Sequence, residues 1–486
     1  MNFVVHSVTT ELTIADRLGL PEYSYYFVLK VFRPVLETLG RVVTVSDPWS
    51  EVDPLYDAAV ARGERCVFLS FSPPNKTPRG LRCPTIPVFA WEFDSIPDEK
   101  LHGNPDENWC EVLRELGHAI THSSFSVRVV RERLGADFDI VSIPAPVWDG
   151  VACRRSEVDA LWADGQVTLE RPGVFLDTRT RSFREAWNFM NTVRREFPLD
   201  LPAEVPGRPG WGDRKRSVKA HAIACYREAF RDLLPDMTAR ALARAVRATA
   251  LRRRGAPEWD AARESPASRD EGPLQLSGLV YTSVFNPADG RKNWQDAVLA
   301  FCAAFSETED ATLVLKLTHR DSVAFLQQVG HLLYKQRPFR CRFVVVAGYL
   351  DEPDYDRLIA ATTYAVNTSS GEGQCLPLME YMSCGRPAVA PAHTGMADYI
   401  HAGNAFIIDS SLEPCAWPHD MSFFFRARRH RVHWESIVAA FRRSAQVYRE
   451  EPAIYRRMSE ASCAAQEATC SSARVVRTLR SFLSLG

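Results

Sequence analysis

Short apolar runs alternate with amphipathic stretches along the first 150 residues of the chain. Apolar runs of strand length are each followed by a segment in which apolar residues recur at helical spacing. This order is typical of right-handed βαβ units, which build a parallel sheet covered by helices on both faces. The predicted strands are Asn2–Val8, Val42–Val45, Cys66–Phe71, Ile86–Trp91, His118–His122 and Phe138–Ile143, and the predicted helices are Tyr26–Leu39, Pro54–Arg62, Asn108–Leu116 and Ser126–Gly135.

A second block with the same alternation covers residues 273–430. We therefore predict an α/β protein with two Rossmann-like, doubly wound parallel-sheet domains. Ligands of open α/β sheets bind beyond the carboxyl ends of the strands, so the two domains are expected to face a cleft that holds the active site. The strands predicted here are Leu279–Phe285, Thr312–Thr318, Arg342–Gly348, Tyr364–Thr368, Ala388–Pro391 and Ala405–Asp409, with helices over Asn293–Phe305, Asp321–Lys335, Tyr355–Thr362 and Cys375–Cys384.

Residues 151–272 break the alternation and are predicted to form a mainly helical insertion with a linker. Within it, a predicted helix over Asp236–Arg254 contains six arginines. Two interpretations stay open for this helix: a solvated helix, which is favoured, or a peripheral contact with an anionic membrane surface. Residues 431–486 are predicted to be helical and to cross back to the N-terminal domain.

The composition is that of an ordinary globular protein. Of 486 residues 46% are apolar and 24% are charged, and the net charge is −1, which excludes a wholly disordered chain and a globally basic nucleic-acid binder. No apolar run approaches the ~20 residues of a membrane span, and the N-terminus lacks the pattern of a signal peptide. We expect a cytoplasmic protein, and a peripheral position at the inner face of the membrane is the open alternative. The twelve cysteines are scattered and are interpreted as reduced thiols, not as metal ligands.

The candidate chemistry is concentrated in Asn367-Thr-Ser-Ser-Gly-Glu-Gly-Gln-Cys-Leu-Pro-Leu-Met-Glu-Tyr-Met-Ser-Cys-Gly385, where a glycine-flanked turn joins a predicted strand to a predicted helix. The free N–H groups at such a helix start are suited to binding a diphosphate. Glu372 lies in the turn and Glu380 lies eight positions later. Two carboxylates at this spacing can serve two ends of one ligand, one at a sugar and one at the ribose hydroxyls.

The string EGQCLPLMEYMSCGRPAVA resembles the Glu-x7-Glu signature of the retaining glycosyltransferases of family 4, the group 1 glycosyltransferases, which have the GT-B fold. The resemblance extends upstream to FNPADGRKNWQDAVLAFCAAF at Phe285–Phe305 and downstream to Gly395–Ile400. It implies transfer of a hexose or similar sugar, with retention, from a UDP- or GDP-linked donor. A saccharide or lipid-linked acceptor is expected, in polysaccharide or glycoconjugate biosynthesis.

The resemblance also assigns roles to individual residues. Arg291 and Lys292 would neutralise the donor diphosphate, and Lys316 would assist them. Glu372 would position the donor sugar and support its developing positive charge, while Glu380 would bind the ribose. The expected donor-binding residues are Arg291, Lys292, Lys316, Gly373, Gln374, Cys375, Leu376 and Glu380. No Asp-x-Asp metal pair stands in a suitable loop, so we expect no metal ligands and no obligatory cofactor.

The N-terminal domain, which the resemblance makes the acceptor side, departs from the family pattern. It lacks the paired glycines after the first strand and the usual histidine at the end of the fourth strand. At the latter place stands Phe89-Ala-Trp-Glu-Phe-Asp, so Glu92 or Asp94 would face the sugar. Either carboxylate, or the departing phosphate oxygen, could accept the proton of the acceptor hydroxyl. His118 and His122 are interpreted as structural.

Two other functions stay open at this stage. The chain could be a sugar-nucleotide-binding protein that kept the fold without catalysis, or a sugar-nucleotide epimerase on the same fold. The presence of Glu372, Glu380, Arg291 and Lys292 favours an enzyme that transfers the sugar.

Overall fold

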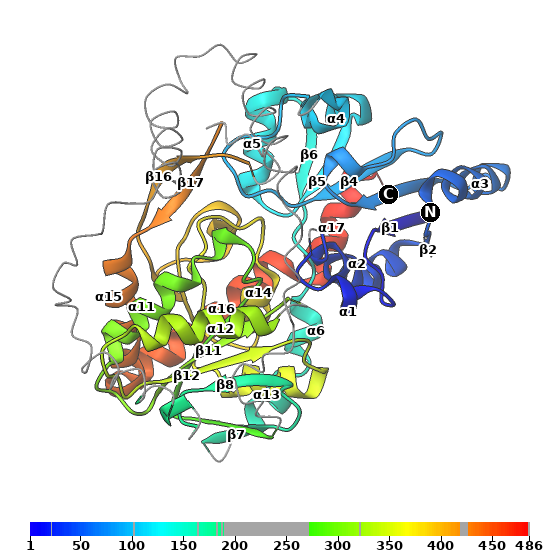
Figure 1. Cartoon of the computed structure of the whole chain (residues 1–486). Coiled ribbons are helices and arrows are strands. Elements are labelled where there is room, and N and C mark those ends of the chain that lie inside the picture. The colour runs from blue at the N-terminus through cyan, green and yellow to red at the C-terminus, as the bar shows by residue number, and fades with distance from the viewer. Residues whose placement is uncertain are drawn as a thin grey trace, which may run out of the picture. The chain divides into compact units, whose positions relative to one another are not determined.

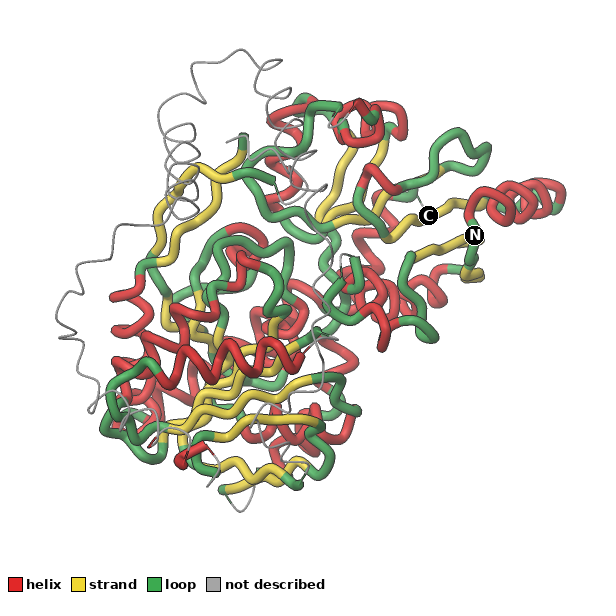
Figure 2. Tube along the Cα trace, viewed as in Figure 1, coloured by secondary structure: helices red, strands yellow, loops and turns green. Residues whose placement is uncertain are grey.

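The computed structural model describes residues 1–484 except 21, 101–102, 163–164, 181–182, 186–187, 189–271, 320–321 and 418–425. The predicted basic helix Asp236–Arg254 and most of the predicted insertion lie outside the described residues. The described part of the chain contains two large, mainly parallel sheets with helices packed on them (Figures 1 and 2).

The first sheet has six parallel strands in the order β2-β1-β3-β4-β5-β6. Its central strand β3 is buried at every position, because helices cover both faces of the sheet. The strands are β1 (Asn2–Ser7), β2 (Arg41–Thr44), β3 (Cys66–Phe71), β4 (Thr85–Phe89), β5 (His118–Thr121) and β6 (Asp139–Ser142). The helices are α1 (Ile14–Arg17), α2 (Ser24–Leu39), α3 (Pro48–Ala61), α4 (Trp109–Leu116) and α5 (Ser124–Leu134), with short 3-10 turns η1 (Pro74–Lys76) and η3 (Pro105–Glu107).

The second sheet has seven strands in the order β15-β14-β13-β10-β11-β12-β8. All neighbours pair in parallel except β8, which is antiparallel to β12. The parallel strands are β10 (Leu279–Phe285), β11 (Ala311–Leu317), β12 (Arg342–Ala347), β13 (Tyr364–Val366), β14 (Ala388–Ala390) and β15 (Ala405–Ile407), and the helices are α11 (Trp294–Phe305), α12 (Ser322–Tyr334), α13 (Glu352–Ala361) and α14 (Leu376–Ser383). The predicted α/β class with two Rossmann-like sheets is confirmed.

The structure differs from the prediction at the start of the expected insertion. After α6 (Trp148–Ala152) and α7 (Arg155–Ala160), the chain forms β7 (Gln166–Leu169), which pairs with β9 (Leu274–Ser277), and β8 (Val174–Asp177), which becomes an edge of the second sheet. These strands are four residues long and their partners are more than a hundred residues away. Such short strands give almost no periodic signal in the sequence.

The C-terminal segment begins with the antiparallel hairpin β16 (Ser410–Cys415) and β17 (Ala427–Val432) and continues as α15 (Trp434–Glu450), α16 (Pro452–Cys470) and α17 (Ser472–Phe482). Helix α15 packs on α11 beside the second sheet, whereas α17 packs on α2 beside the first (Figure 1). The Arg65 guanidinium donates hydrogen bonds to the carbonyls of Leu483 and Ser484. Among the described residues no helix combines the length and the apolar character needed to cross a bilayer.

A buried ion pair holds β8 on the sheet. Arg342 on β12 donates from Nε to Asp177 Oδ1 at 3.1 Å and from Nη2 to Oδ2 at 2.7 Å. Asp177→Ala leaves the guanidinium buried without its partner, so we expect the free energy of unfolding to fall by about 3–5 kcal/mol. Denaturation in urea measures this change.

Glu37→Ala is the matched control, because its partner Arg33 lies on an exposed helix face. We expect a loss below about 1 kcal/mol there. Replacing the whole buried pair, as Asp177→Leu with Arg342→Met, should restore most of the stability. Equal losses in Asp177→Ala and Glu37→Ala would contradict a structural role for the buried pair.

Candidate active site

Arg291 and Lys292 lie on a single 3-10 turn, η6 (Gly290–Lys292), between β10 and α11. Asp289 caps this turn by accepting a hydrogen bond from the Arg291 backbone, and its carboxylate also binds the guanidinium, with Nη2 at 2.6 Å. The Arg291 Nη1 atom is 2.6 Å from Glu92 Oε1, and it donates to the Gly371 carbonyl at 3.1 Å. Glu92 follows β4 of the first sheet, so Arg291 joins loops from both sheets.

Lys292 contacts the first glutamate of the Glu-x7-Glu motif. Its Nζ lies 2.7 Å from Glu372 Oε1, and the same oxygen accepts hydrogen bonds from Ser369 Oγ at 2.6 Å and Asn367 Nδ2 at 3.2 Å. The other oxygen, Oε2, accepts no hydrogen bond from any described residue. Glu372 is therefore fixed through one oxygen and has the second available for a ligand.

Glu92, Asp289, Arg291, Lys292 and Glu372 form one cluster of charges. Their pKa values depend on burial and on the attraction between neighbouring charges. Burial opposes ionisation of Glu372, but Lys292 and Arg291 outweigh it and hold the pKa of this carboxyl below its ordinary value. For Glu92 burial outweighs the attraction of Arg291, and the pKa is raised. Burial also disfavours the charged form of Lys292, yet Glu372 keeps the pKa of the ammonium above its usual value.

Close backbone approach brings the loops together. A Cβ atom built on Gly373 would lie 2.7 Å from Ala90 Cβ, and one built on Gly395 would lie 2.2 Å from the Gly373 carbonyl oxygen. Neither distance is sterically possible. The loop that carries Glu372 therefore needs glycine at position 373 to pass the residues after β4. The turn η7 (Thr394–Asp398) needs glycine at position 395 to approach that loop.

Helix α14 begins directly after this loop. Cys375 precedes it with a left-handed backbone, φ +69°, and the backbone N–H groups of Gln374, Cys375 and Leu376 donate to no described residue. The Gln374 side chain accepts a hydrogen bond from the Ala145 backbone at 2.8 Å. The start of α14 thus presents unpaired N–H groups beside Glu372, as the sequence predicts.

Glu380 lies further along α14, apart from the cations. The hydroxyl of Tyr355 on α13 donates to its Oε2 at 2.6 Å, and Oε1 accepts no hydrogen bond from the described residues. Burial raises the pKa of Glu380, against the effect of the Tyr355 hydrogen bond. The two glutamates therefore sit in different surroundings, one held by a cation and the other by a phenol.

The structure separates two other predicted residues from the cluster. Asp94 accepts a hydrogen bond from the Arg428 backbone at 2.6 Å and pairs with the guanidinium of that residue on β17. Lys316 at the end of β11 is buried and donates to the carbonyls of Leu317 and Gly348, and burial lowers its pKa to about 8. No group of three or more His, Cys, Asp or Glu side chains in the described chain could hold a metal ion.

Three residues of the cluster were not assigned a role from the sequence. Asp289 binds Arg291, and Asn367 and Ser369 bind Glu372. Asp289 stands two positions before Arg291, where an N-cap residue is common, so capping preference could have identified it. Asn367 and Ser369 belong to the motif itself, but nothing in their spacing indicates that both side chains turn toward the same carboxylate oxygen.

Residues 290–417 match the family model described as glycosyl transferases group 1. The predicted resemblance to this group is thereby confirmed for that segment, and it supports sugar transfer as the reaction class. No curated protein sequence matches the chain.

Solved structures with a similar chain course share little sequence with this protein. The Anabaena protein HepE in complex with UDP-glucose is 11% identical, with a TM-score of 0.48 over 100% of this chain and 99% of its own. A Rickettsia africae glycosyltransferase is 10% identical, with a TM-score of 0.48, and WaaG, a glycosyltransferase involved in lipopolysaccharide biosynthesis, is 10% identical, with a TM-score of 0.49; both cover 100% of each chain.

His122, a buried histidine directly after β5, gives a prediction about pH. His122 donates from Nδ1 to the Ile143 carbonyl, and burial lowers its pKa to about 4. The unfolded chain, with an ordinary histidine pKa near ~6.5, takes up the proton first. Stability contributed by neutral His122 is therefore complete above pH ~6.5 and is lost as the pH falls toward about 4, by up to about 1.4 kcal/mol per pH unit.

His122→Gln keeps a side chain that can donate to the Ile143 carbonyl but cannot titrate. We expect its free energy of unfolding, measured in urea between pH 7 and 5, to fall less steeply than that of the wild type. His118→Gln, at the start of β5, is the control, because the His118 side chain is exposed. Identical slopes for wild type and His122→Gln would show that this histidine is not buried neutral.

Proposed function

We propose that the protein is a retaining glycosyltransferase that moves a sugar from a UDP- or GDP-linked donor to a saccharide or lipid-linked acceptor. One observation carries the proposal: Glu372 is fixed through Oε1 by Lys292, Ser369 and Asn367 and keeps Oε2 unpaired, beside the open N-terminus of α14. The segment that contains it matches group 1 glycosyl transferases.

The donor diphosphate would bind between η6 and the start of α14. The N–H groups of Gln374, Cys375 and Leu376 supply hydrogen bonds and the positive end of the helix dipole, and Lys292 supplies a full charge. Negative charge grows on the diphosphate as the bond to the sugar breaks. Cations and N–H groups held in place before reaction stabilise that charge without reorganisation, so catalysis would be chiefly electrostatic.

The two glutamates would bind the two ends of the donor. Glu372 Oε2 would accept from the sugar hydroxyls and, as an anion, support the positive charge that develops on the ring. Glu380 would receive the ribose hydroxyls at Oε1, because Tyr355 occupies its other oxygen. Gly373 would place this loop at the donor, because its missing side chain lets the loop pass Ala90.

For the acceptor proton, Glu92 is a better candidate than Asp94. Glu92 lies in the cation cluster, and a largely buried carboxyl whose pKa is raised above its ordinary value is a stronger base than a free one. Asp94 instead pairs with Arg428. The departing phosphate oxygen is the alternative acceptor of this proton.

Lys292→Met tests the diphosphate site, since methionine keeps most of the stem but removes the charge. We expect kcat/KM for the donor to fall by more than about tenfold, or about 1.4 kcal/mol of transition-state stabilisation. The assay measures nucleoside diphosphate release from a panel of UDP- and GDP-linked sugars.

Lys100→Met is the matched control, because that ammonium is exposed and pairs only with Glu111 among the contacts described. Its kinetics should equal those of the wild type. Wild-type kinetics in a folded Lys292→Met protein would mean that η6 does not bind the diphosphate.

Glu380→Ala tests the ribose assignment. A hydrogen bond to a charged group is worth about 1.5–3 kcal/mol, so the Kd for UDP or GDP should rise about tenfold to 150-fold. Calorimetry with UDP and with 2′-deoxy-UDP sharpens the test. The wild type should discriminate between the two nucleotides and Glu380→Ala should not; equal discrimination by both proteins would exclude Glu380 as the ribose ligand.

A further inference from the structure

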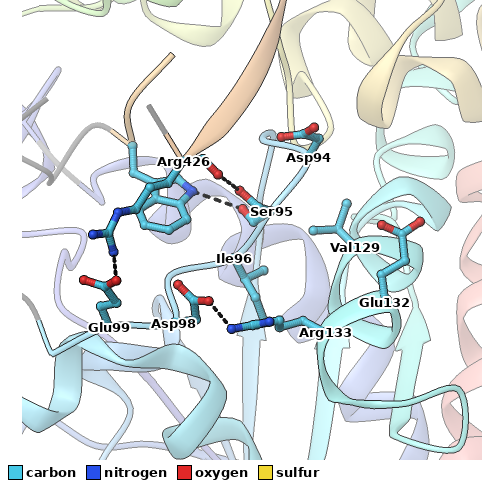
Figure 3. Close-up of a pocket in the computed structure, with 10 residues that line it drawn as sticks. Asp94, Ser95, Ile96, Asp98, Glu99, Val129, Glu132, Arg133 and Arg426 are labelled. Atoms are coloured by element: carbon cyan, nitrogen blue, oxygen red, sulfur yellow. Dashed lines mark hydrogen bonds and ion pairs between the residues drawn. The ribbon is translucent and has the colours of Figure 1, made fainter. Parts of the chain in front are cut away.

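A cavity of about 490 Å³ lies where the loop after β4 meets α5 and the hairpin β16–β17 (Figure 3). It is distinct from the cluster around Lys292 and Glu372. Of the residues that line it, only Asp94 was a candidate for a role in the reaction. The residues that line it are Asp94, Ser95, Ile96, Asp98, Glu99, Val129, Glu132, Arg133, Trp417 and Arg426.

The cavity combines an apolar base with a charged rim. Ile96, Val129 and Trp417 are each at least 97% buried. Around them the carboxylates are matched by arginines in four ion pairs, two of which Figure 3 shows directly. These pairs are Asp94 with Arg428, Asp98 with Arg133, Glu99 with Arg426, and Glu132 with Arg128.

The cavity is coupled to the candidate active site through two short connections. Ser95 accepts hydrogen bonds at its carbonyl from the indoles of Trp91 and Trp417, at 2.7 and 3.1 Å, so the loop that lines the cavity is fixed just after Glu92. On the other side, the backbone of His430 on β17 donates to the Ser370 carbonyl at 2.9 Å, two residues before Glu372. The cavity thus lies against the loop that carries Glu92 and against the hairpin that contacts the loop of Glu372.

We infer that this cavity binds the acceptor and that the acceptor is a neutral saccharide. The inference rests on the proposed transferase function. Each sugar hydroxyl both donates and accepts hydrogen bonds, and a rim that contains both carboxylates and guanidinium groups offers both kinds of partner.

The same rim disfavours the other classes of acceptor. A lipid chain would bury charged groups without replacing their hydrogen bonds, which is costly. A phosphorylated or uronic-acid acceptor would bring a further negative charge next to four carboxylates whose arginines are already engaged. A lipid-linked acceptor is therefore less suited to this cavity than a neutral saccharide.

Glu132→Trp tests the assignment by filling the cavity from an exposed position of α5. Its matched control is Glu37→Trp, because both glutamates form exposed i,i+4 pairs with arginine, Arg128 and Arg33. Saturation-transfer NMR with maltose, cellobiose and lactose, without donor, should show binding to the wild type and Glu37→Trp and a loss of at least about tenfold in affinity in Glu132→Trp. Glucose 6-phosphate and glucuronic acid should bind more weakly than glucose.

A second measurement separates this inference from the proposed function. The rate of nucleoside diphosphate release is measured with and without each disaccharide. For each protein, stimulation is the ratio of the rate with the disaccharide to the rate without it. Stimulation in the wild type that drops at least about tenfold in Glu132→Trp supports the inference. Equal stimulation in both, or stimulation by a polyprenyl-linked sugar alone, overturns it. A third result is that Glu132→Trp abolishes disaccharide binding while neither the wild type nor a variant turns over any donor. This result retains the cavity as a saccharide site and overturns the transferase proposal.

Discussion

The ion pair between Lys292 and Glu372 is the interaction on which the candidate site depends. Glu372 is buried and Lys292 is largely buried, so either charge alone would be costly at that position. Together with Arg291, Asp289 and Glu92 they form a network in which each charge has a partner. A bound diphosphate would contact Lys292 while Lys292 stays paired with Glu372. The Glu372 carboxylate would then remain oriented toward the donor sugar.

The fold supplies this network by converging loop ends. Residues after β4, β10 and β13 meet because parallel strands bring their carboxyl ends to one edge of each sheet. Glycines at 373 and 395 allow the backbones to approach more closely than any side chain would permit. The hairpin β16–β17 then adds contacts to Ser95 and Ser370, so one C-terminal element touches both the proposed acceptor cavity and the loop that carries Glu372.

Sequence patterns predicted the features that depend on residues close together in the chain. The alternation of apolar runs and helical segments predicted both sheets, and the motif around Glu372 placed the glycine turn and the open helix start. Partners distant in sequence could not be read in this way: β8 joins β12, and Asp94 turns to Arg428 instead of the cluster. Glu92 and Asp94 were equivalent candidates in the sequence. Only the direction in which each side chain leaves the loop after β4 distinguishes them.

The most direct measurement is a crystal structure of the protein with bound UDP or GDP. We predict that the terminal phosphate lies within hydrogen-bond distance of Lys292 Nζ and of the N–H groups that open α14, with the ribose at Glu380. A diphosphate bound elsewhere, with Lys292 still paired only with Glu372 and the start of α14 empty, would contradict it.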